Sequence, residues 1–489
     1  MKKTVSVASP THSSAKKVAA KKIAINQTAL PHLSFSRGAL EDIVQTTLAM
    51  AKEMGATDCV AEISEGSGLS VSVRKGQIET IEQNQDKGLS VTVYIGDKPG
   101  ARTVRRGSAS TSDFSLTALK DTVSAAYNIA RFTADDDCAG LAEPELYAKN
   151  IRDPKLFYPW SIDSEKAIQI ATTAEAAALA VDPAIRNSDG ASVSAQHSQF
   201  IMANSQGFMG GYPYSRHFIS VAPIAATGRG RNMQMQRDDW YTSMRDPADL
   251  LAPAKIGKYA AKRALARLNA RQLDTRKCPV LFEAPLAIGL LGAFVQAVSG
   301  GSLYRKSTFL VDSLGQEIFA PHIAIIDDPF LKKAFGTAPF DDEGVATKKR
   351  DVVKGGVVQG YFLSSYSARK LGMQTTGNSG GSHNLVLKSR LTKAADDFKA
   401  MLKKMDTGLL VTDLMGQGVN YVTGDYSRGA SGFWVQGGKI RYPVEEITIA
   451  GNLRDMFKNI VAVGSDVMVR GSKECGSILI NEMTVAGGN

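Results

Sequence analysis

The sequence has few of the residues on which metal sites and disulfides depend. It contains 4 cysteines, Cys59, Cys138, Cys278 and Cys475, in a chain of 489 residues. No two of them form a CxxC pair, which counts against a zinc knuckle or a thioredoxin-type site. Cysteines this few and this far apart are typical of a reducing compartment. We therefore expect a cytoplasmic protein.

Histidine is also scarce, with 6 residues in the chain. His197 and His217 are twenty residues apart, and no pair of histidines is closer. A helical zinc site needs two imidazoles about one turn apart, so that both face one ion. The residues alone therefore indicate no metal site and no evident catalytic cluster.

Acidic residues are absent from the beginning of the chain, where Glu41 is the first. The net charge is +10, and 6 of these charges are lysines that precede Glu41: Lys2, Lys3, Lys16, Lys17, Lys21 and Lys22. The rest of the chain is close to balanced, so a basic groove for nucleic acid is not expected. We predict a disordered basic tail over residues 1–35.

Long apolar runs are missing as well. The longest extends from Ala284 to Val298 and is interrupted by Pro285 and Gln296. It is shorter than the roughly 18–20 residues that a membrane span needs. We expect no membrane association.

The periodicities that are present predict an α+β protein with a mixed α/β N-terminal half and a mainly antiparallel β C-terminal half. The polar stretch 269–277 separates an N-terminal region, 36–268, from a C-terminal β-rich domain, 275–489. A break near 140–160 is expected if the first region contains two subdomains. Predicted helices cover 39–54, 116–129, 164–181, 248–268 and 284–298; predicted strands cover 59–63, 69–73, 78–81 and 89–94; glycine pairs predict hairpins at 352–358 and 433–440.

Several motifs of the C-terminal half, in the right order, carry a family resemblance. They are PFDDEGVAT at 339–347, GYFLSSYSARKLG at 360–372 and MGQGVNYVTGDYSRGASGFWVQGGKIRYPVEEITIAGNL at 415–453. These segments resemble the PmbA (TldE) branch of the TldD/PmbA metallopeptidase family, a U62-like peptidase family. The resemblance extends from about Ser36 to the C-terminus.

The resemblance implies peptide hydrolysis in the cytoplasm by a TldD–TldE heterodimer that acts on unfolded or leader-bearing peptides. In that family zinc belongs to the TldD subunit, on a helical HExxxH motif followed by a distant cysteine. The corresponding positions here are Gly292, Ala293 and Ala297, and Cys475 does not clearly match the third ligand. The resemblance therefore implies a subunit without its own zinc, with a TldD-like partner that holds the metal. Catalytic residues in this chain remain unassigned.

Substrate contacts are sought in the glycine-rich segment from Gly416 to Gly438, where backbone can approach backbone closely. Asp425, Ser427 and Arg428 are the candidate substrate-binding residues, although a structural turn explains them nearly as well. The alternative function is a stand-alone peptide- or nucleic-acid-binding protein without peptidase activity. A self-sufficient peptidase that uses unrecognised groups is a third hypothesis. Co-purification with a HExxxH-bearing partner discriminates the first two.

Overall fold

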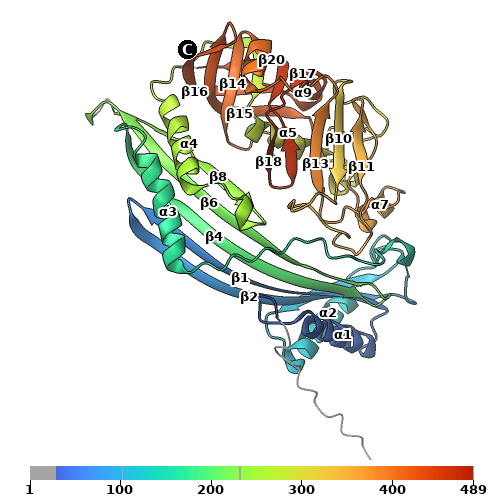
Figure 1. Cartoon of the computed structure of the whole chain (residues 1–489). Helices are drawn as coiled ribbons and strands as arrows, with labels where there is room; N and C mark the ends of the chain where they lie inside the picture. The colour runs from blue at the N-terminus through green and yellow to red at the C-terminus, as the bar shows by residue number, and fades with distance from the viewer. Residues whose placement is uncertain (1–28, 102, 231–232, 488–489) are drawn as a thin grey trace, which may run out of the picture.

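The computed structural model describes residues 29–101, 103–230 and 233–487 and has the predicted α+β architecture (Figure 1). Residues 1–28 of the predicted tail lie outside the described residues. No α-helix in these ranges is long and apolar enough to cross a membrane. The described α-helices are α1 (Arg37–Glu53), α2 (Leu116–Phe132), α3 (Ser164–Leu179), α4 (Pro253–Ala266), α5 (Ala284–Ala297), α6 (Gly300–Tyr304), α7 (Ser365–Lys370), α8 (Phe398–Met405) and α9 (Leu453–Lys458).

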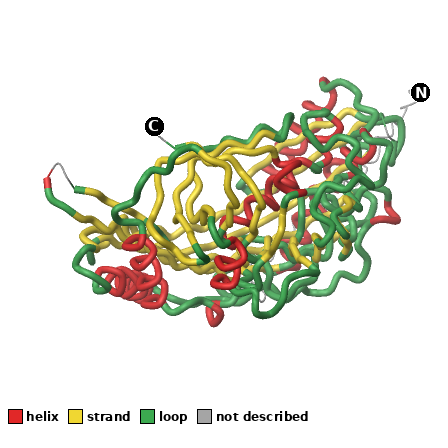
Figure 2. The backbone as a smooth tube through the Cα atoms, turned by 90° about the horizontal axis from the view of Figure 1, so that it is seen from above, coloured by secondary structure: helices red, strands yellow, loops and turns green. Residues whose placement is uncertain are grey.

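The N-terminal half is built on one long curved sheet with the strand order β3-β2-β1-β4-β6-β7, to which β5 and β8 are attached. Its strands are β1 (Asp58–Arg74), β2 (Gln77–Ile95), β3 (Arg105–Thr111), β4 (Ile185–Asn204), β5 (Met209–Gly210), β6 (Pro213–Thr227), β7 (Gln234–Arg237) and β8 (Trp240–Met244). The pair α1 and α2 covers one end of the sheet, and α3 and α4 cover the other (Figure 1). Figure 2 shows the strands running along the length of the molecule.

The predicted division of the first strands is wrong. Segments 59–63 and 69–73 are one continuous strand, β1, and segments 78–81 and 89–94 are one strand, β2. Glycines between them suggested breaks, but Gly66 and Gly68 do not have positive φ. A Cβ at Gly68 would lie 2.0 Å from Oε1 of Gln196 on β4. Both glycines lie inside the paired strand, where the chain continues without a turn and the end of the Gln196 side chain occupies the space beside Gly68.

The helices follow the predicted caps, with one correction. Asp163, the predicted cap of α3, accepts a hydrogen bond from the backbone N–H of Lys166, which satisfies a donor at the start of the helix. The predicted helix at 248–268 begins later, at Pro253. Residues 247–249 form a separate 3₁₀ turn, and proline is favoured in the first turn of an α-helix because its missing N–H has no helical acceptor there.

The C-terminal half contains two six-stranded sheets with α5 packed between them. One has the order β12-β11-β10-β13-β19-β18 and the other β16-β15-β14-β9-β20-β17. Their strands are β9 (Arg276–Phe282), β10 (Ile323–Asp328), β11 (Arg350–Lys354), β12 (Val357–Val358), β13 (Asn384–Ser389), β14 (Gly408–Met415), β15 (Asp425–Gln436), β16 (Lys439–Asn452), β17 (Ile460–Val463), β18 (Met468–Arg470), β19 (Lys473–Cys475) and β20 (Ile478–Ala486). Both predicted hairpins are confirmed, and their glycine pairs have positive φ.

Residues 29–35 are packed on the sheet, which corrects the predicted extent of the tail. Leu33 is buried, and the ring of His32 stacks on that of His197 at 4.2 Å between centroids. The backbone N–H groups of Ser34 and Phe35 each donate to the Glu65 carboxylate at 2.9 Å. Composition alone missed this segment because its contacts are with strands far along the chain.

Candidate functional site

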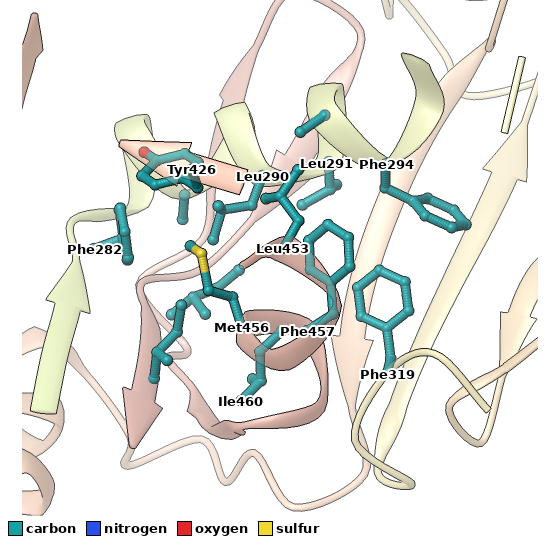
Figure 3. Close-up of a cluster of buried hydrophobic side chains, with 14 of the residues drawn as sticks. Phe282, Leu290, Leu291, Phe294, Phe319, Tyr426, Leu453, Met456, Phe457 and Ile460 are labelled. Atoms are coloured by element: carbon teal, nitrogen blue, oxygen red, sulfur yellow. The ribbon is translucent and has the colours of Figure 1, made fainter. Parts of the chain in front are cut away.

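Helix α5 has one face buried in the C-terminal core and another face on which Gly289 and Gly292 carry no side chain. Leu290, Leu291 and Phe294 belong to the core, where the Phe294 ring meets those of Phe319 and Phe457 edge-on (Figure 3). A Cβ at Gly289 on the other face would meet no atom within 4 Å, and one at Gly292 would meet only Cε of Lys473, at 4.0 Å. The core therefore holds the helix in place while this face stays open.

The residues at α5 do not fit a zinc ion. Between Ala284 and Ala297 there is no histidine, cysteine, aspartate or glutamate. Cys475 is completely buried, and burial raises the pKa of its thiol, which disfavours the thiolate that binds zinc. Within the described residues, one group has three potential ligand atoms within 4.8 Å of one another: Asp136, Asp137 and Cys138. It lies on a loop, where Lys370 already pairs with both aspartates.

The three predicted substrate-binding residues lie on β15 but do not face the same way. Asp425 is exposed and accepts hydrogen bonds from Thr423 Oγ1 at 2.6 Å and Asn452 Nδ2 at 3.2 Å. These bonds hold the pKa of Asp425 below its usual value. Ser427 is also exposed. Because successive side chains of a strand alternate between its two sides, Arg428 is separated from both and lies toward α5.

A cavity of about 110 Å³ lies between α5 and the chain from β14 to β15. Leu286, Gly289, Leu290 and Ala293 line it from the helix. Opposite them lie Leu414, Gln417, Val419, Tyr421, Tyr426 and Arg428. Of these, the sequence analysis named only Arg428; alternation along the strand also indicates Tyr426, two positions earlier on the same side.

A larger cavity of about 470 Å³ lies between the N-terminal sheet and loops of the C-terminal half. Glu62 of β1 and Asp342 face it from the two halves, and His383 lies beside Asp342. Burial, and then the charge of Asp342, raise the pKa of Glu62; burial also raises the pKa of Asp342, which His383 opposes. The guanidinium of Arg245 also lines this cavity, so charged groups of both signs face it. The sequence analysis missed Glu62, which is 280 residues from Asp342 in the chain.

The PFDDEGVAT motif builds the wall of this larger cavity. The Asp341 carboxylate accepts hydrogen bonds from the backbone N–H groups of Glu343 at 2.9 Å, Val345 at 3.0 Å and Ser379 at 2.9 Å. Asp341 is buried and thus ties its own turn to the 377–383 loop. The motif has a structural role at Asp341 and presents a free side chain at Asp342.

Comparisons with known proteins show similarity over most of the chain. Three family models described as PmbA/TldA metallopeptidase match consecutive parts of the chain. They are domain 1 at residues 59–130, the central domain at 157–268 and the C-terminal domain at 275–487. The chain belongs to the PmbA/TldD metallopeptidase family. Within that family it belongs to the PmbA (TldE) branch, since it is 45% identical over 466 residues to "Metalloprotease PmbA" of Escherichia coli O157:H7, covering 95% of this chain and 100% of the relative.

A more distant sequence relative and two solved structures are also similar to this chain. A TldD homologue from Haemophilus influenzae is 24% identical and covers 83% of this chain and 87% of its own. A crystal structure from Bacteroides thetaiotaomicron, described as a proposed modulator of DNA gyrase, superimposes with a TM-score of 0.85 at 26% identity, covering 93% of this chain and 100% of its own. TldE from Thermococcus kodakarensis has a TM-score of 0.77 at 18% identity, with 91% and 100% covered.

Proposed function

We propose that this chain is the zinc-free, PmbA/TldE-type subunit of a cytoplasmic two-subunit metallopeptidase, and that a TldD-like partner holds the zinc. One observation carries the proposal. Helix α5, which the family resemblance aligns with the partner's HExxxH helix, has Gly292, Ala293 and Ala297 at the three motif positions. The helix is present and one of its faces is open, but the two histidines that would bind the metal and the glutamate that would activate its water are replaced.

The role of this chain is then to bind and orient an extended peptide beside the partner's site. Zinc in the partner supplies Lewis-acid activation of water and of the scissile carbonyl. Groups of this chain supply binding: the cavity beside α5 offers the cation of Arg428, and the larger cavity offers the carboxylates of Glu62 and Asp342. Unfolded or leader-bearing peptides are the proposed substrates, because extended chains expose the backbone that such a site must hold.

Two features support the proposed cytoplasmic location. The four cysteines are all buried and all unpaired, as in proteins of reducing compartments. Burial also raises the pKa values of their thiols, which keeps them in the unreactive form.

The test is a reconstitution with the TldD-like protein of the same cell. Hydrolysis of an unfolded peptide is measured for each chain alone, for the mixture, and for the mixture with a chelator, and metal content is determined for each separated chain. We expect chelator-sensitive hydrolysis only in the mixture, with zinc only in the partner. About one tightly bound zinc in this chain, or chelator-sensitive hydrolysis by this chain alone, would contradict the proposal. Full activity of the partner alone would favour the stand-alone binding protein.

A further inference from the structure

The open face of α5 has glycines that packing within this chain does not explain. Glycine inside a helix is less favourable than alanine, because its backbone loses more conformational freedom. In α4 the reason for Gly257 is clear, because a Cβ there would lie 2.0 Å from the backbone oxygen of Ala174 on α3. No comparable contact exists at Gly289 or Gly292. These positions therefore fit the close approach of something other than the described part of the chain.

The cavity beside Gly289 contains a cation without a counter-charge. Arg428 forms no ion pair within the described ranges, and its buried Nε–H has no hydrogen-bond acceptor there. Its described polar neighbour is the Tyr426 hydroxyl, which is itself buried. Leaving a buried guanidinium N–H unsatisfied is unfavourable, and an anionic ligand would remove that cost.

A second amine borders the same face of the helix. Cε of Lys473 on β19 lies 4.0 Å from the Cβ position of Gly292, one helical turn from Gly289. Lys473 is half-buried and has neither an ion pair nor a hydrogen bond among the residues that the structure describes. Burial lowers the pKa of its amine. Among the described residues, two cationic side chains thus border this face, and the cavity lining contains no carboxylate.

We propose that the cavity between α5 and β15 binds the C-terminal carboxylate of a peptide, with Arg428 as the cation that contacts it and with the peptide backbone lying along Gly289 and Gly292. The inference deepens the proposed function in one respect, since it takes a peptide as the ligand. A volume of about 110 Å³ accommodates a carboxylate with a short stem, because one water occupies about 30 Å³ of liquid. Lys473 adds a favourable charge to the end of the groove.

The test measures equilibrium binding to the full chain alone by titration calorimetry, with three N-acetylated peptides as probes. They are tetra-alanine with a free carboxylate, its C-terminal amide, and an amide with one glutamate in place of an alanine. We expect the acid to bind at least about 10-fold more tightly than the alanine amide, as expected for a charge-assisted pair. The glutamyl amide should bind like the alanine amide, since its carboxylate is not at the chain end.

Two variants and one control complete the experiment. Arg428→Gln should reduce the preference for the acid to within about 2-fold, and Gly289→Leu, which places a side chain in the cavity, should weaken binding of every probe. Arg441→Gln is the matched control, because the exposed Arg441 donates only to the backbone oxygen of Gln436, at 3.2 Å, and it should keep the full preference.

Equal binding of acid and amide, no measurable binding of the acid, or an unchanged preference in Arg428→Gln would overturn the site. Equal binding of the acid and the glutamyl amide would overturn its assignment to the chain end. The two proposals fail separately. An acid preference that depends on Arg428 stands even if the mixture with the partner hydrolyses nothing, and hydrolysis by the mixture stands even if acid and amide bind alike.

Discussion

Two arginines lie beside α5, and their surroundings are opposite. Arg263 of α4 donates through Nη1 to both carboxylate oxygens of Glu283, at 2.8 and 3.0 Å, and through Nε to Asp238 at 2.9 Å. All three side chains are largely buried. Arg428 has no carboxylate partner in the part of the chain that the structure describes.

Arg263 therefore contributes to the stability of the fold, whereas Arg428 is available to bind a ligand. Glu283 is the residue before α5, so the Arg263 cluster fixes the start of that helix against the central region. A buried ion pair is costly to break, because the remaining partner stays desolvated. Arg428, by contrast, lacks a described acceptor for its Nε–H and has no described carboxylate partner. Removing it therefore leaves no described carboxylate buried without a partner. Stability should therefore depend on the first arginine and peptide binding on the second.

Removing Arg263 should give the largest effect. Arg263→Ala leaves the buried Glu283 without its ion-pair partner, whereas Asp238 keeps Arg267 at 3.5 Å. The loss should lower the free energy of unfolding by about 3–5 kcal/mol. Chemical denaturation followed by circular dichroism measures this. Arg237→Ala is the control, because the ion pair between Arg237 of β7 and Asp189 of β4 is exposed and should contribute less than about 1 kcal/mol. Similar losses of unfolding free energy in both variants would show that the buried Arg263 cluster is no more stabilising than an exposed ion pair.

The fold class and most of α5 could be predicted from the sequence, because they follow from local periodicity. The start of α3 could be predicted from its capping residue, Asp163. The sequence was insufficient where distant segments decide the outcome. β1 is continuous because it pairs with β2 and β4 along its length, and the docking of His32 depends on His197. The candidate site shows the same limit.

Arg428 was identified from its glycine-rich segment, whereas the cavity that it faces needs Leu286 to Ala293 from a helix far earlier in the chain. Asp425 and Ser427 were grouped with it by proximity in sequence, but strand alternation separates them from it. The prediction that this chain binds no zinc depends on which residues stand at 292, 293 and 297, and it came from the family resemblance rather than from the fold.

The buried pair His197 and His217 gives a second comparison, because each Nε2 is hydrogen-bonded while one Nδ1 is without a described partner. His197 Nε2 accepts a hydrogen bond from the Trp160 N–H at 3.0 Å, while Nδ1 of His217 has no partner among the described residues. Burial, and then the charges of His32 and His217, lower the pKa of His197 to about 3. Burial also lowers the pKa of His217.

The unfolded chain therefore binds a proton at His197 below about pH 6.5 that the folded chain does not bind. Stability should fall with decreasing pH by about 1.4 kcal/mol per unit from this group between pH 6.5 and 3. His197→Gln, whose amide oxygen can still accept from Trp160, should reduce the measured slope of unfolding free energy against pH by that amount. An unchanged slope would show that His197 is protonated in the folded state.

Arg428→Ala should have a small effect on stability and a clear effect on function. The free energy of unfolding should change by less than about 1 kcal/mol, since no ion pair is lost. Hydrolysis by the mixture with a zinc-bearing partner should show a raised KM for peptide, with the zinc content unchanged. A stability loss as large as that of Arg263→Ala would instead assign Arg428 to the structural core.

The smallest effect is expected from the beginning of the chain, which lacks apolar periodicity up to about Leu33. Deleting Met1–Thr28 should shift the melting temperature by less than about 1 °C, since this segment has no apolar face to bury. Extending the deletion to Phe35 also removes the stacking of His32 on His197 and the two N–H donors to Glu65. That longer deletion should lower the melting temperature by several degrees, because buried Glu65 then loses hydrogen bonds. Equal melting temperatures for the two truncated chains would show that the contacts of 29–35 contribute nothing, and a large drop for the shorter deletion would show that the basic tail docks.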